Sequence, residues 1–377
     1  MKQRLAIFSP HIGVRSETFI KRHINELAPG RTVAIAQNAA DRTNSSKLTG
    51  CPVLVVDQTA GFYKRIPSVI KNRLLAEWLQ RKDLGLIKRY LRTNSVSVLL
   101  GEYLDSSWIL LPLVRDMGIN FFAHAHGYDL SQFYRNELWR RRYADYASAT
   151  GLIVVNKPMR SRLESVGIPR EKIHIIPYGV DVPTEAPIRH DKRVMSCLAV
   201  GRMVSKKAPL KLLDSFRLAL LQNPDLYLDY VGTGPLYQEA YQFVHSNGLE
   251  NKVCLRGGCN NELVMELMSN ADCFLQHSIV DPETGDEEGL PVAILEAMSV
   301  GLPVISTRHA GIPEAVSHET TGLLVEEGDI EGMAKFIVQL SEDFEQRSAL
   351  GEAGWARALE RYSWEREKEQ LQSLMGL

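Results

Sequence analysis

Two glutamates stand eight residues apart around the start of a predicted helix in the second half of the chain. Glu288 precedes this helix, which should begin at Pro291 because proline suits the first helical position, and Glu296 lies about two turns inside it. Unsatisfied N–H groups at Gly289 and Leu290, together with the helix dipole, would favour an anion such as a phosphate. Two carboxylates that flank such a position suit a ligand with hydroxyls at both ends and phosphates between them, which describes a nucleotide sugar. An equally open alternative is that the acidic residues only complement the helix dipole.

Two cations occupy another loop of the same half. Arg202 and Lys207 lie between a predicted strand over 195–202 and the helix that follows. Cations at a strand-to-helix loop can hold a diphosphate, because arginine offers a fork of donors and lysine a compact point charge. The alternative interpretation is a solvated basic loop.

In the first half, polar residues follow two predicted strands. Glu102 ends one apolar run, and His126 and Asp129 follow the next. Open parallel sheets bind their ligands at the carboxyl ends of strands, so these residues are candidates for a site. A histidine at a strand end can instead be hydrogen bonded within the core, and that alternative stays open.

Strand and helix patterns alternate from one end of the chain to the other, which predicts mostly parallel α/β sheets. A chain of 377 residues has room for two domains. The segment 183–193 is polar, contains prolines and lacks periodicity, so we place a linker there. The predicted domains are 1–184 and 185–360, and the last helix, 361–377, is expected to pack on the first domain.

The net charge of −1 hides an uneven distribution. Residues 1–184 contain 27 Lys and Arg against 15 Asp and Glu, a balance of +12, which leaves 17 against 30, or −13, for the remainder. The basic half is expected to meet an anionic surface or ligand. A basic amphipathic stretch over 62–93 fits either the surface of an anionic membrane or a domain helix with a solvated face.

Other compositional features exclude several classes of protein. The five cysteines form no zinc pattern and are expected to be buried free thiols in a reducing cytoplasm. The chain has no apolar run long enough to span a membrane, and its first apolar run is too short for a signal peptide. It carries no recognised nucleic-acid motif, so nucleic acid is not an expected partner.

Several segments resemble family-four retaining glycosyltransferases, in particular those of exopolysaccharide and colanic-acid type. Glu288 and Glu296 match the E-(x)7-E motif of that family, and the segment 311–314, GIPE, matches the sequence that follows it. Arg202 and Lys207 match its GR-(x)4-K element, although Ala208 stands where the family often has glycine. Further matches are SETFI, HGYD and PYGVD, at 16–20, 126–129 and 177–181.

The resemblance implies two Rossmann-like domains that face each other across a cleft, the GT-B arrangement, and sugar transfer without a metal or other cofactor. It implies that Arg202, Lys207 and the N–H groups of Gly289 and Leu290 neutralise the leaving diphosphate. It also implies that Glu296 binds the ribose and that three residues contact the transferred sugar, namely Glu288, His126 and Asp129. Gly13 is implied to contact the donor phosphates. Arg256 and Gly257 are implied to contact the base.

The implied reaction moves a hexose from a nucleotide-diphosphate sugar, UDP- or GDP-linked, to a hydroxyl of a glycan or lipid-linked glycan. The implied location is the cytoplasm, at the inner face of the membrane. Acceptor specificity is expected to lie in the loops 38–50 and 131–145. Two alternatives are a nucleotide-sugar epimerase of the same architecture and a non-catalytic nucleotide-sugar-binding scaffold.

Overall fold

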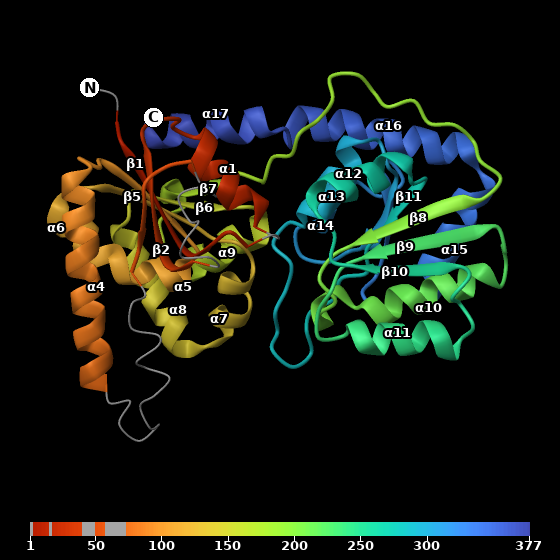
Figure 1. Cartoon of the computed structure of the whole chain (residues 1–377), viewed down its shortest axis with the longest axis horizontal. Helices are drawn as coiled ribbons and strands as arrows, with labels where there is room; N and C mark the ends of the chain where they lie inside the picture. Colours follow the sequence, from red (N-terminus) through yellow and green to blue (C-terminus); the bar gives the residue numbers. More distant parts are fainter. Residues whose placement is uncertain (1–2, 15–16, 40–49, 57–72) are drawn as a thin grey trace. The chain divides into compact units, whose positions relative to one another are not determined.

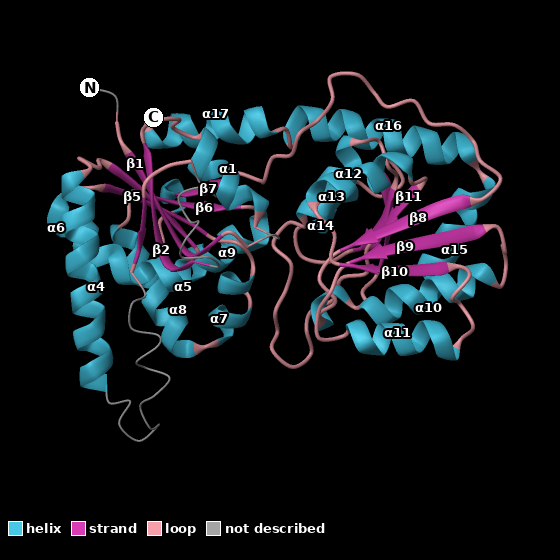
Figure 2. Cartoon of the chain, viewed as in Figure 1, coloured by secondary structure: helices cyan, strands magenta, loops and turns pink. Residues whose placement is uncertain are grey.

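The chain folds as two compact units, shown in the computed structural model of Figure 1, which describes residues 3–14, 17–39, 50–56 and 73–377. Unit 1 consists of Met1–Ile176 and Lys368–Leu377, and unit 2 consists of Pro177–Glu367. Each unit is built on a parallel sheet against which helices pack (Figure 2). The predicted pair of parallel α/β domains is therefore confirmed.

Unit 1 contains a seven-stranded sheet in the order β3-β2-β1-β4-β5-β6-β7. Its strands are β1 (Leu5–Ile12), β2 (Thr32–Ala39), β3 (Val53–Val55), β4 (Val98–Glu102), β5 (Asn120–His124), β6 (Gly151–Val154) and β7 (Ile173–Ile175). The chain builds the sheet outward from β1 to β3 and then returns to add β4 on the other side of β1. The order of strands therefore reverses between β1 and β4, where a doubly wound sheet opens a ligand-binding crevice.

The helices of unit 1 connect these strands. They are α1 (Thr18–Glu26), α4 (Arg73–Thr93), α5 (Leu104–Ser107), α6 (Leu111–Met117), α7 (Gln132–Arg135), α8 (Glu137–Tyr143) and α9 (Lys157–Ser165). The basic stretch predicted over 62–93 ends as α4, while residues 57–72 and most of the predicted loop 38–50 lie outside the described residues. Among the described helices, none combines the length and the apolar character needed to cross a membrane.

Unit 2 contains a six-stranded sheet in the order β10-β9-β8-β11-β12-β13. Its strands are β8 (Met195–Val200), β9 (Leu226–Val231), β10 (Val253–Gly257), β11 (Cys273–Leu275), β12 (Val304–Thr307) and β13 (Gly322–Val325). Here the order reverses between β8 and β11. The strands are mostly apolar because helices cover both faces of a parallel sheet, and Leu198, Phe274 and Ile305 are at most 1% exposed.

The helices of unit 2 are α10 (Pro209–Leu220), α11 (Tyr237–Ser246), α12 (Asn261–Asn270), α13 (Val292–Ser299), α14 (Ile312–Ala315), α15 (Ile330–Glu342) and α16 (Phe344–Arg361). Polar side chains cap several of their first turns. The Asn260 side chain accepts from the Leu263 N–H at α12, and Asp329 accepts from the Gly332 N–H at α15. Such caps satisfy N–H groups that have no partner inside the helix.

The predicted linker is attached to unit 2. Arg189 donates hydrogen bonds to the carbonyl oxygens of Ser269, Ala271 and Val300. The last helix, α17 (Trp364–Met375), begins in unit 2, and its residues from Lys368 onward belong to unit 1.

Two contacts fix the ends of α17. Near its start, the Gly179 N–H donates to Glu367 Oε2 at 2.6 Å, and a Cβ at Gly179 would lie 2.6 Å from the Ser363 carbonyl oxygen. Near its end, Gln372 Nε2 donates to the Leu27 carbonyl oxygen at 2.9 Å. Glycine is required at position 179 because the backbone at Gly179 and the backbone at Ser363 approach so closely that a Cβ would clash.

Candidate functional site

In unit 2, candidate residues follow the two strands at which the strand order reverses. Arg202 and Lys207 lie in the loop after β8, and Glu288 lies in the long loop after β11. These loops stand side by side at the carboxyl edge of the sheet, since the Ile279 N–H donates to the Lys206 carbonyl oxygen at 2.9 Å. The topology therefore brings together residues that are about 80 positions apart, 81 for Lys206 and Glu287.

The loop between β11 and α13, residues 276–291, is called the acidic loop here. Two lysines converge on it. Lys207 Nζ lies 3.3 Å from Glu288 Oε2, and Lys206 Nζ lies 3.9 Å from Glu288 Oε1. Lys206 also pairs with Asp286 Oδ2 at 2.9 Å and donates to the Glu287 carbonyl oxygen at 3.1 Å. The sequence pattern predicted Lys207 and Glu288 for one site, and the structure places them in contact; Lys206 joins them.

Burial and charge act in opposite directions on Glu288. Its side chain is 10% exposed, and burial by itself would raise the pKa of the carboxyl. The charges of Lys207 and Lys206, with His309 nearby, outweigh burial and lower the pKa below its usual value. Glu288 is therefore an ionised carboxylate that balances two ammonium groups.

A histidine that sequence reasoning missed holds the backbone of Glu288. His309 lies just after β12, is 1% exposed, and accepts the Glu288 N–H at Nε2 over 3.0 Å. Its Nδ1 lies 2.6 Å from Glu327 Oε1, and the other carboxylate oxygen of Glu327 accepts the Val280 N–H at 2.8 Å. One carboxylate thus anchors both ends of the acidic loop, directly at Val280 and through His309 at Glu288.

The helix after the acidic loop begins one residue later than predicted. Pro291 has an extended ψ of 113° and its carbonyl oxygen accepts from the Ile294 N–H, so it is the N-cap and α13 begins at Val292. Gly289 and Leu290 accordingly lie in the loop ahead of the helix, and their predicted contact with phosphate stays a prediction. Glu296 lies on α13 and is half-buried.

Close backbone packing shapes the loop that carries Arg202. A Cβ at Gly232 would stand 1.9 Å from the Gly201 carbonyl oxygen, so only glycine fits between the two loops. Arg202 itself is exposed. Ala208 adopts a left-handed conformation, φ 38° and ψ 54°, at the N-cap of α10. Glycine enters this region without strain, which explains why the family pattern often has glycine here; alanine keeps the loop geometry at a conformational cost.

The residues predicted to meet the base lie at the end of β10. Arg256 Nε donates to Asp229 Oδ1 at 2.6 Å, so its side chain is held by a neighbouring strand. Gly257 has a positive φ of 67°. Their predicted contact with a base stays a prediction.

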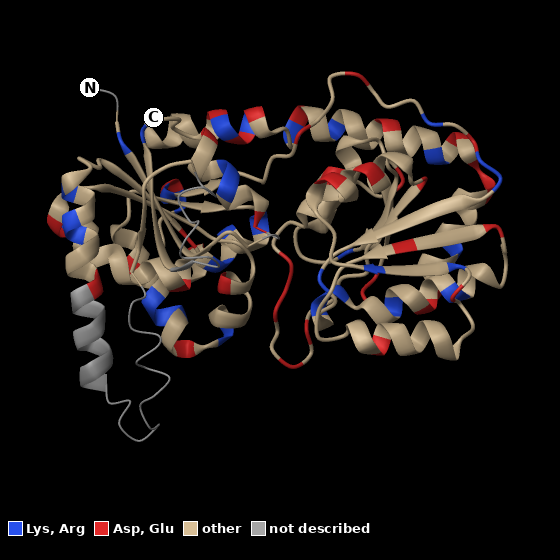
Figure 3. Ribbon diagram, viewed as in Figure 1, with Lys and Arg blue, Asp and Glu red and all other residues tan. Residues whose placement is uncertain are grey.

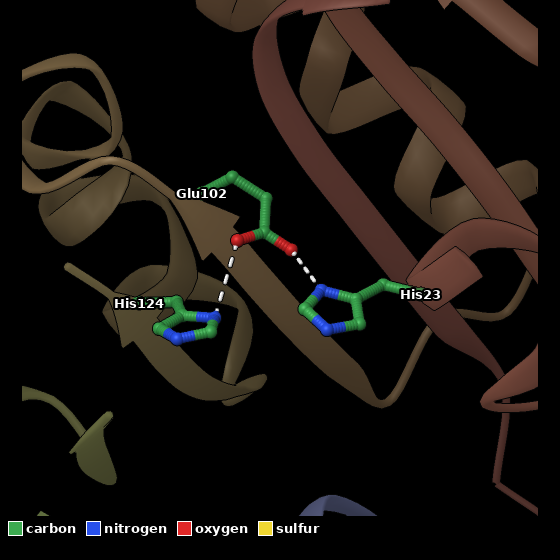
Figure 4. Close-up of side chains that lie close together, drawn as sticks. All are labelled: His23, Glu102 and His124. Atoms are coloured by element: carbon green, nitrogen blue, oxygen red, sulfur yellow. Dashed lines mark hydrogen bonds and ion pairs between the residues drawn. The ribbon is translucent and has the colours of Figure 1, made fainter. Parts of the chain in front are cut away.

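In unit 1, three histidines surround one buried carboxylate, that of Glu102, and Figure 4 shows two of them, His23 and His124. Glu102 is the last residue of β4, and its Oε1 lies 2.8 Å from His23 Nδ1. Its Oε2 lies 2.7 Å from His126 Nε2 and 3.4 Å from His124 Nδ1. Glu102, His23 and His124 are 0% exposed, and the side chain of His126 is 2% exposed. The strand-end residues noted in the sequence therefore form one cluster, to which α1 adds His23.

Asp129 holds the turn that follows His126. One carboxylate oxygen accepts the N–H groups of His126 and Gly127, at 2.9 and 3.0 Å, and the other accepts the Leu104 N–H at 3.0 Å. Burial raises the pKa of Asp129 to about 7, against the effect of these donors. Because Asp129 is fully buried, these backbone contacts account for it without a sugar, and its predicted contact with substrate stays a prediction.

Gly13 and the basic segment of unit 1 complete the predicted positions. Gly13 follows β1 with a φ of 89°, in a region that favours glycine. Figure 3 shows basic residues on α8, where Arg140, Arg141 and Arg142 succeed one another, and acidic residues along the loop between β11 and α13.

Two family models cover most of the chain. Residues 51–183 match the model described as Glycosyltransferase Family 4, and residues 185–357 match the model described as Glycosyl transferases group 1. Each model corresponds to most of one unit.

Curated relatives include two enzymes of glycan synthesis. The chain is 30% identical over 221 residues to the amylovoran biosynthesis glycosyltransferase AmsK of Erwinia amylovora, covering 58% of this chain and 54% of AmsK. It is 27% identical over 304 residues to a GDP-mannose-dependent alpha-(1-6)-phosphatidylinositol monomannoside mannosyltransferase of Mycolicibacterium smegmatis, covering 74% of this chain and 78% of that protein. The alignment with AmsK thus spans about half the length of that relative.

Solved structures of low sequence identity share the fold. HepE of Anabaena in complex with UDP superposes with a TM-score of 0.79 at 18% identity, with complete coverage of both chains. Sucrose-phosphate synthase from Thermosynechococcus elongatus gives a TM-score of 0.78 at 20% identity, covering 99% of this chain and 98% of that one. The predicted family and GT-B fold are confirmed, and the chain belongs to the glycosyltransferases that combine a family 4 first domain with a group 1 second domain.

Proposed function

We propose that this glycosyltransferase moves a hexose from a nucleotide-diphosphate sugar to a hydroxyl of a glycan or lipid-linked glycan, with retention of the anomeric configuration. The observation that carries the proposal is the contact of Lys207 with Glu288 at the carboxyl edge of unit 2, where the strand order reverses. That position is where a doubly wound sheet binds nucleotides.

The cations of unit 2 would stabilise the leaving diphosphate. Lys207 contacts Glu288 at the carboxyl edge of the sheet, and Arg202 is exposed in the same loop as Lys207. Together with the N–H groups of Gly289 and Leu290, they would neutralise charge that develops on the diphosphate as the glycosidic bond breaks. Stabilisation of developing charge by fixed donors is commonly the largest contribution to catalysis.

Other predicted residues would hold the rest of the donor. Glu296 on α13 would bind the ribose hydroxyls, and Glu288 would bind hydroxyls of the sugar. The β10 segment with Arg256 and Gly257 would meet the base. On unit 1, His126 would orient the sugar.

The reaction needs no metal in this proposal. Lys206, Lys207 and Arg202 provide positive charge at the position where the diphosphate would bind. A divalent cation bridging the phosphates would duplicate their role.

The relatives indicate candidate donors and acceptors. HepE is described in complex with UDP and with UDP-glucose, and the mycolicibacterial relative is GDP-mannose-dependent. UDP- and GDP-linked hexoses are therefore the first donors to test. AmsK acts in amylovoran biosynthesis, which favours a polysaccharide precursor as acceptor.

We further propose that unit 1 contacts an anionic membrane surface from the cytoplasmic side. On α8, Leu138 is 56% exposed beside three consecutive arginines. An exposed apolar residue among basic residues suits the boundary between lipid headgroups and acyl chains. Sedimentation with phosphatidylglycerol vesicles, compared with phosphatidylcholine vesicles, tests this contact.

A transfer assay tests the reaction. The protein is incubated with UDP-glucose, UDP-galactose or GDP-mannose and synthetic lipid-linked mono- and disaccharides, with EDTA present, and the product is analysed by NMR. The proposal predicts an α-linked product from one α-linked donor. A β-linked product would contradict retention, and loss of activity in EDTA would contradict metal independence.

The same assay separates the two alternatives. Conversion of the donor to its epimer without acceptor would indicate an epimerase. Donor binding without transfer to any of the acceptors would indicate a binding scaffold. Either result would contradict the proposed function.

A further inference from the structure

Two ammonium groups stand at the carboxyl edge of the unit 2 sheet, and the acidic loop meets both of them. Glu288 pairs with Lys207, and Lys206 Nζ lies 2.9 Å from Asp286 Oδ2. The lysine side chains are mostly buried, at 19% exposure for Lys206 and 15% for Lys207. Partly buried ion pairs are screened less than pairs on an open surface. An anion that binds at this edge must therefore compete with the carboxylates of the loop.

The contacts of Lys206 show which groups oppose an incoming anion. Its Nζ donates to the Glu287 carbonyl oxygen at 3.1 Å, in addition to the pair with Asp286, and Glu288 Oε1 lies 3.9 Å away. An ammonium group has three N–H donors, so Lys206 can hold a neutral carbonyl and a charged group together. The charge that opposes the anion comes from the two carboxylates alone among these three contacts.

The two carboxylates are not held equally. Glu288 is 10% exposed and lies between Lys206 and Lys207, and its backbone N–H donates to the buried His309. Asp286 is 22% exposed, so water can solvate its carboxylate when it leaves the lysine. A carboxylate that moves toward water loses less than one that must leave two ammonium groups inside the protein. Asp286 is therefore the partner that an anion displaces more readily.

A compact turn presents Asp286 to the lysine. The Asp281 N–H donates to the Asp286 carbonyl oxygen at 2.9 Å, and the Gly285 N–H donates to the Asp281 carbonyl oxygen at 2.8 Å. Asp281 Oδ1 accepts two further N–H groups of the turn, at 2.8 and 2.9 Å. On the opposite side, the Lys206 carbonyl oxygen accepts the Ile279 N–H. Both partners of the ion pair thus come from positioned backbone, and the pair is formed before any ligand arrives.

We propose that Asp286 is an intramolecular competitor of the sugar donor: its carboxylate pairs with Lys206 until the diphosphate displaces it. This inference rests on the proposed function, in which a diphosphate binds where the strand order reverses between β8 and β11. Asp286 thereby lowers the affinity of the protein for the nucleotide sugar and for the nucleoside diphosphate product. Its return to Lys206 assists release of that product after sugar transfer.

The opposite role for Asp286 is to orient Lys206 toward the ligand. A side chain that is already ordered loses less freedom on binding, so loss of the carboxylate would then weaken the binding of an anion. Competition predicts the reverse. The direction in which Asp286→Asn changes affinity therefore distinguishes the two roles.

The test is isothermal titration calorimetry of the whole protein in EDTA, with UDP, GDP and inorganic pyrophosphate as separate ligands. Asp286→Asn keeps the shape of the side chain and removes its charge. Its dissociation constants for pyrophosphate and for one nucleotide should fall about three- to tenfold, as expected for loss of a partly screened charge beside the anion. Asp286→Ala, measured alongside, should show the same gain. The gain should shrink at high salt.

Two further variants show whether the gain acts through Lys206. Glu283→Gln, the matched control, removes an exposed charge from the same turn and should change affinity by about twofold or less. Lys206→Ala should bind these anions more weakly. Adding Asp286→Asn to Lys206→Ala should then give a smaller gain than it gives in the wild type, because the two side chains are coupled.

Failure of this inference and failure of the proposed function give different results. Equal or weaker binding by Asp286→Asn, or an equal gain in Glu283→Gln, would contradict the competition while the donor site stands. Pyrophosphate binding with the expected gain, but no binding of UDP or GDP, would contradict the proposed donor and leave the competition standing. No binding of any of the three ligands by any of the proteins would contradict both.

Discussion

At the scale of single residues, the two lysines at the edge of the unit 2 sheet are paired with carboxylates. Lys207 and Lys206 are opposed by Glu288 and Asp286 at distances of 2.9 to 3.9 Å. Opposite charges this close attract by about 4 kcal/mol at an effective dielectric constant of about 20. A diphosphate would compete with these carboxylates for the same ammonium groups. Binding would thus exchange one set of ion pairs for another, which leaves Glu288 available for a hydroxyl.

A buried histidine gives a pH-dependent prediction. His277 is 0% exposed and accepts the Gly328 N–H at Nε2, and burial lowers its pKa to about 4. Between pH 6.5 and 4 the unfolded chain takes up a proton that the folded protein refuses, so acid favours unfolding in this window. His277→Gln should therefore reduce the slope of unfolding free energy against pH by about 1.4 kcal/mol per unit there.

Urea unfolding of wild type and variant at a series of pH values measures this slope. Above pH 7 His277 is neutral in both the folded and the unfolded protein. The plots of unfolding free energy against pH for wild type and variant should therefore run parallel there and provide the internal control. Equal slopes between pH 4 and 6.5 would show that His277 is not kept neutral in the folded protein.

The candidate residues differ in how far the sequence alone could identify them. The glutamate pair and Lys207 lie in local patterns, so their chemistry is visible in the linear chain. Glu288 and His309 are 21 residues apart, and His23 and Glu102 are 79 apart. Their contacts depend on strand order and on which helix covers which face, and neither follows from local spacing. The strands were predictable because most of their residues are apolar, as is usual for the buried strands of a parallel sheet.

At the scale of elements, the acidic loop before α13 is long but anchored. Glu327 accepts from Val280 and contacts His309, which in turn accepts from Glu288. These contacts fix both ends of the loop. Its middle, residues 281–287, is held by Lys206, which contacts Asp286 and the Glu287 carbonyl oxygen. The position of Glu288 thus depends on residues from three strand ends.

His309→Ala should release this loop. The change leaves the Glu288 N–H and one Glu327 oxygen without their partner, a loss of about 1 to 3 kcal/mol. Local opening should become about tenfold or more frequent. Cleavage by a glutamate-specific protease after Glu283 and Glu287, followed by mass spectrometry, measures the opening.

His245→Ala is the matched control, because His245 forms an exposed pair with Glu250 at 2.8 Å on another helix. It should leave cleavage of the acidic loop unchanged. If His309→Ala cleaves no faster than this control, then the histidine does not anchor the loop.

At the scale of the whole molecule, the last helix links the two units in sequence. Its first residues belong to unit 2, and its residues from Lys368 onward belong to unit 1. Leu371 and Met375, at 0% and 2% exposure, are part of the buried surface there. The stability of unit 1 therefore depends on a segment that the chain adds last.

Leu371→Ala should destabilise unit 1 by about 2 to 5 kcal/mol, the usual loss for a buried leucine. Hydrogen exchange resolved by peptide should show faster exchange in β1 and β4, with little change in β8 and β9. Leu359→Ala, at a position that is 36% exposed on α16, is the control and should change stability by about 0.5 kcal/mol or less. Faster exchange in unit 2 alone would contradict the assignment of this segment to unit 1.

The edge of unit 2 is proposed to bind a nucleoside diphosphate through Lys207 and Glu296. The most direct measurement is thermal unfolding of wild type, Lys207→Ala and Glu296→Ala with UDP or GDP in EDTA, with Lys335→Ala, an exposed lysine on α15, as control. A ligand that binds the folded state raises the melting temperature by mass action. We expect a rise in melting temperature with one nucleotide, which both site variants lose and the control keeps. No rise with either nucleotide, or an equal rise in all four proteins, would contradict binding at this edge.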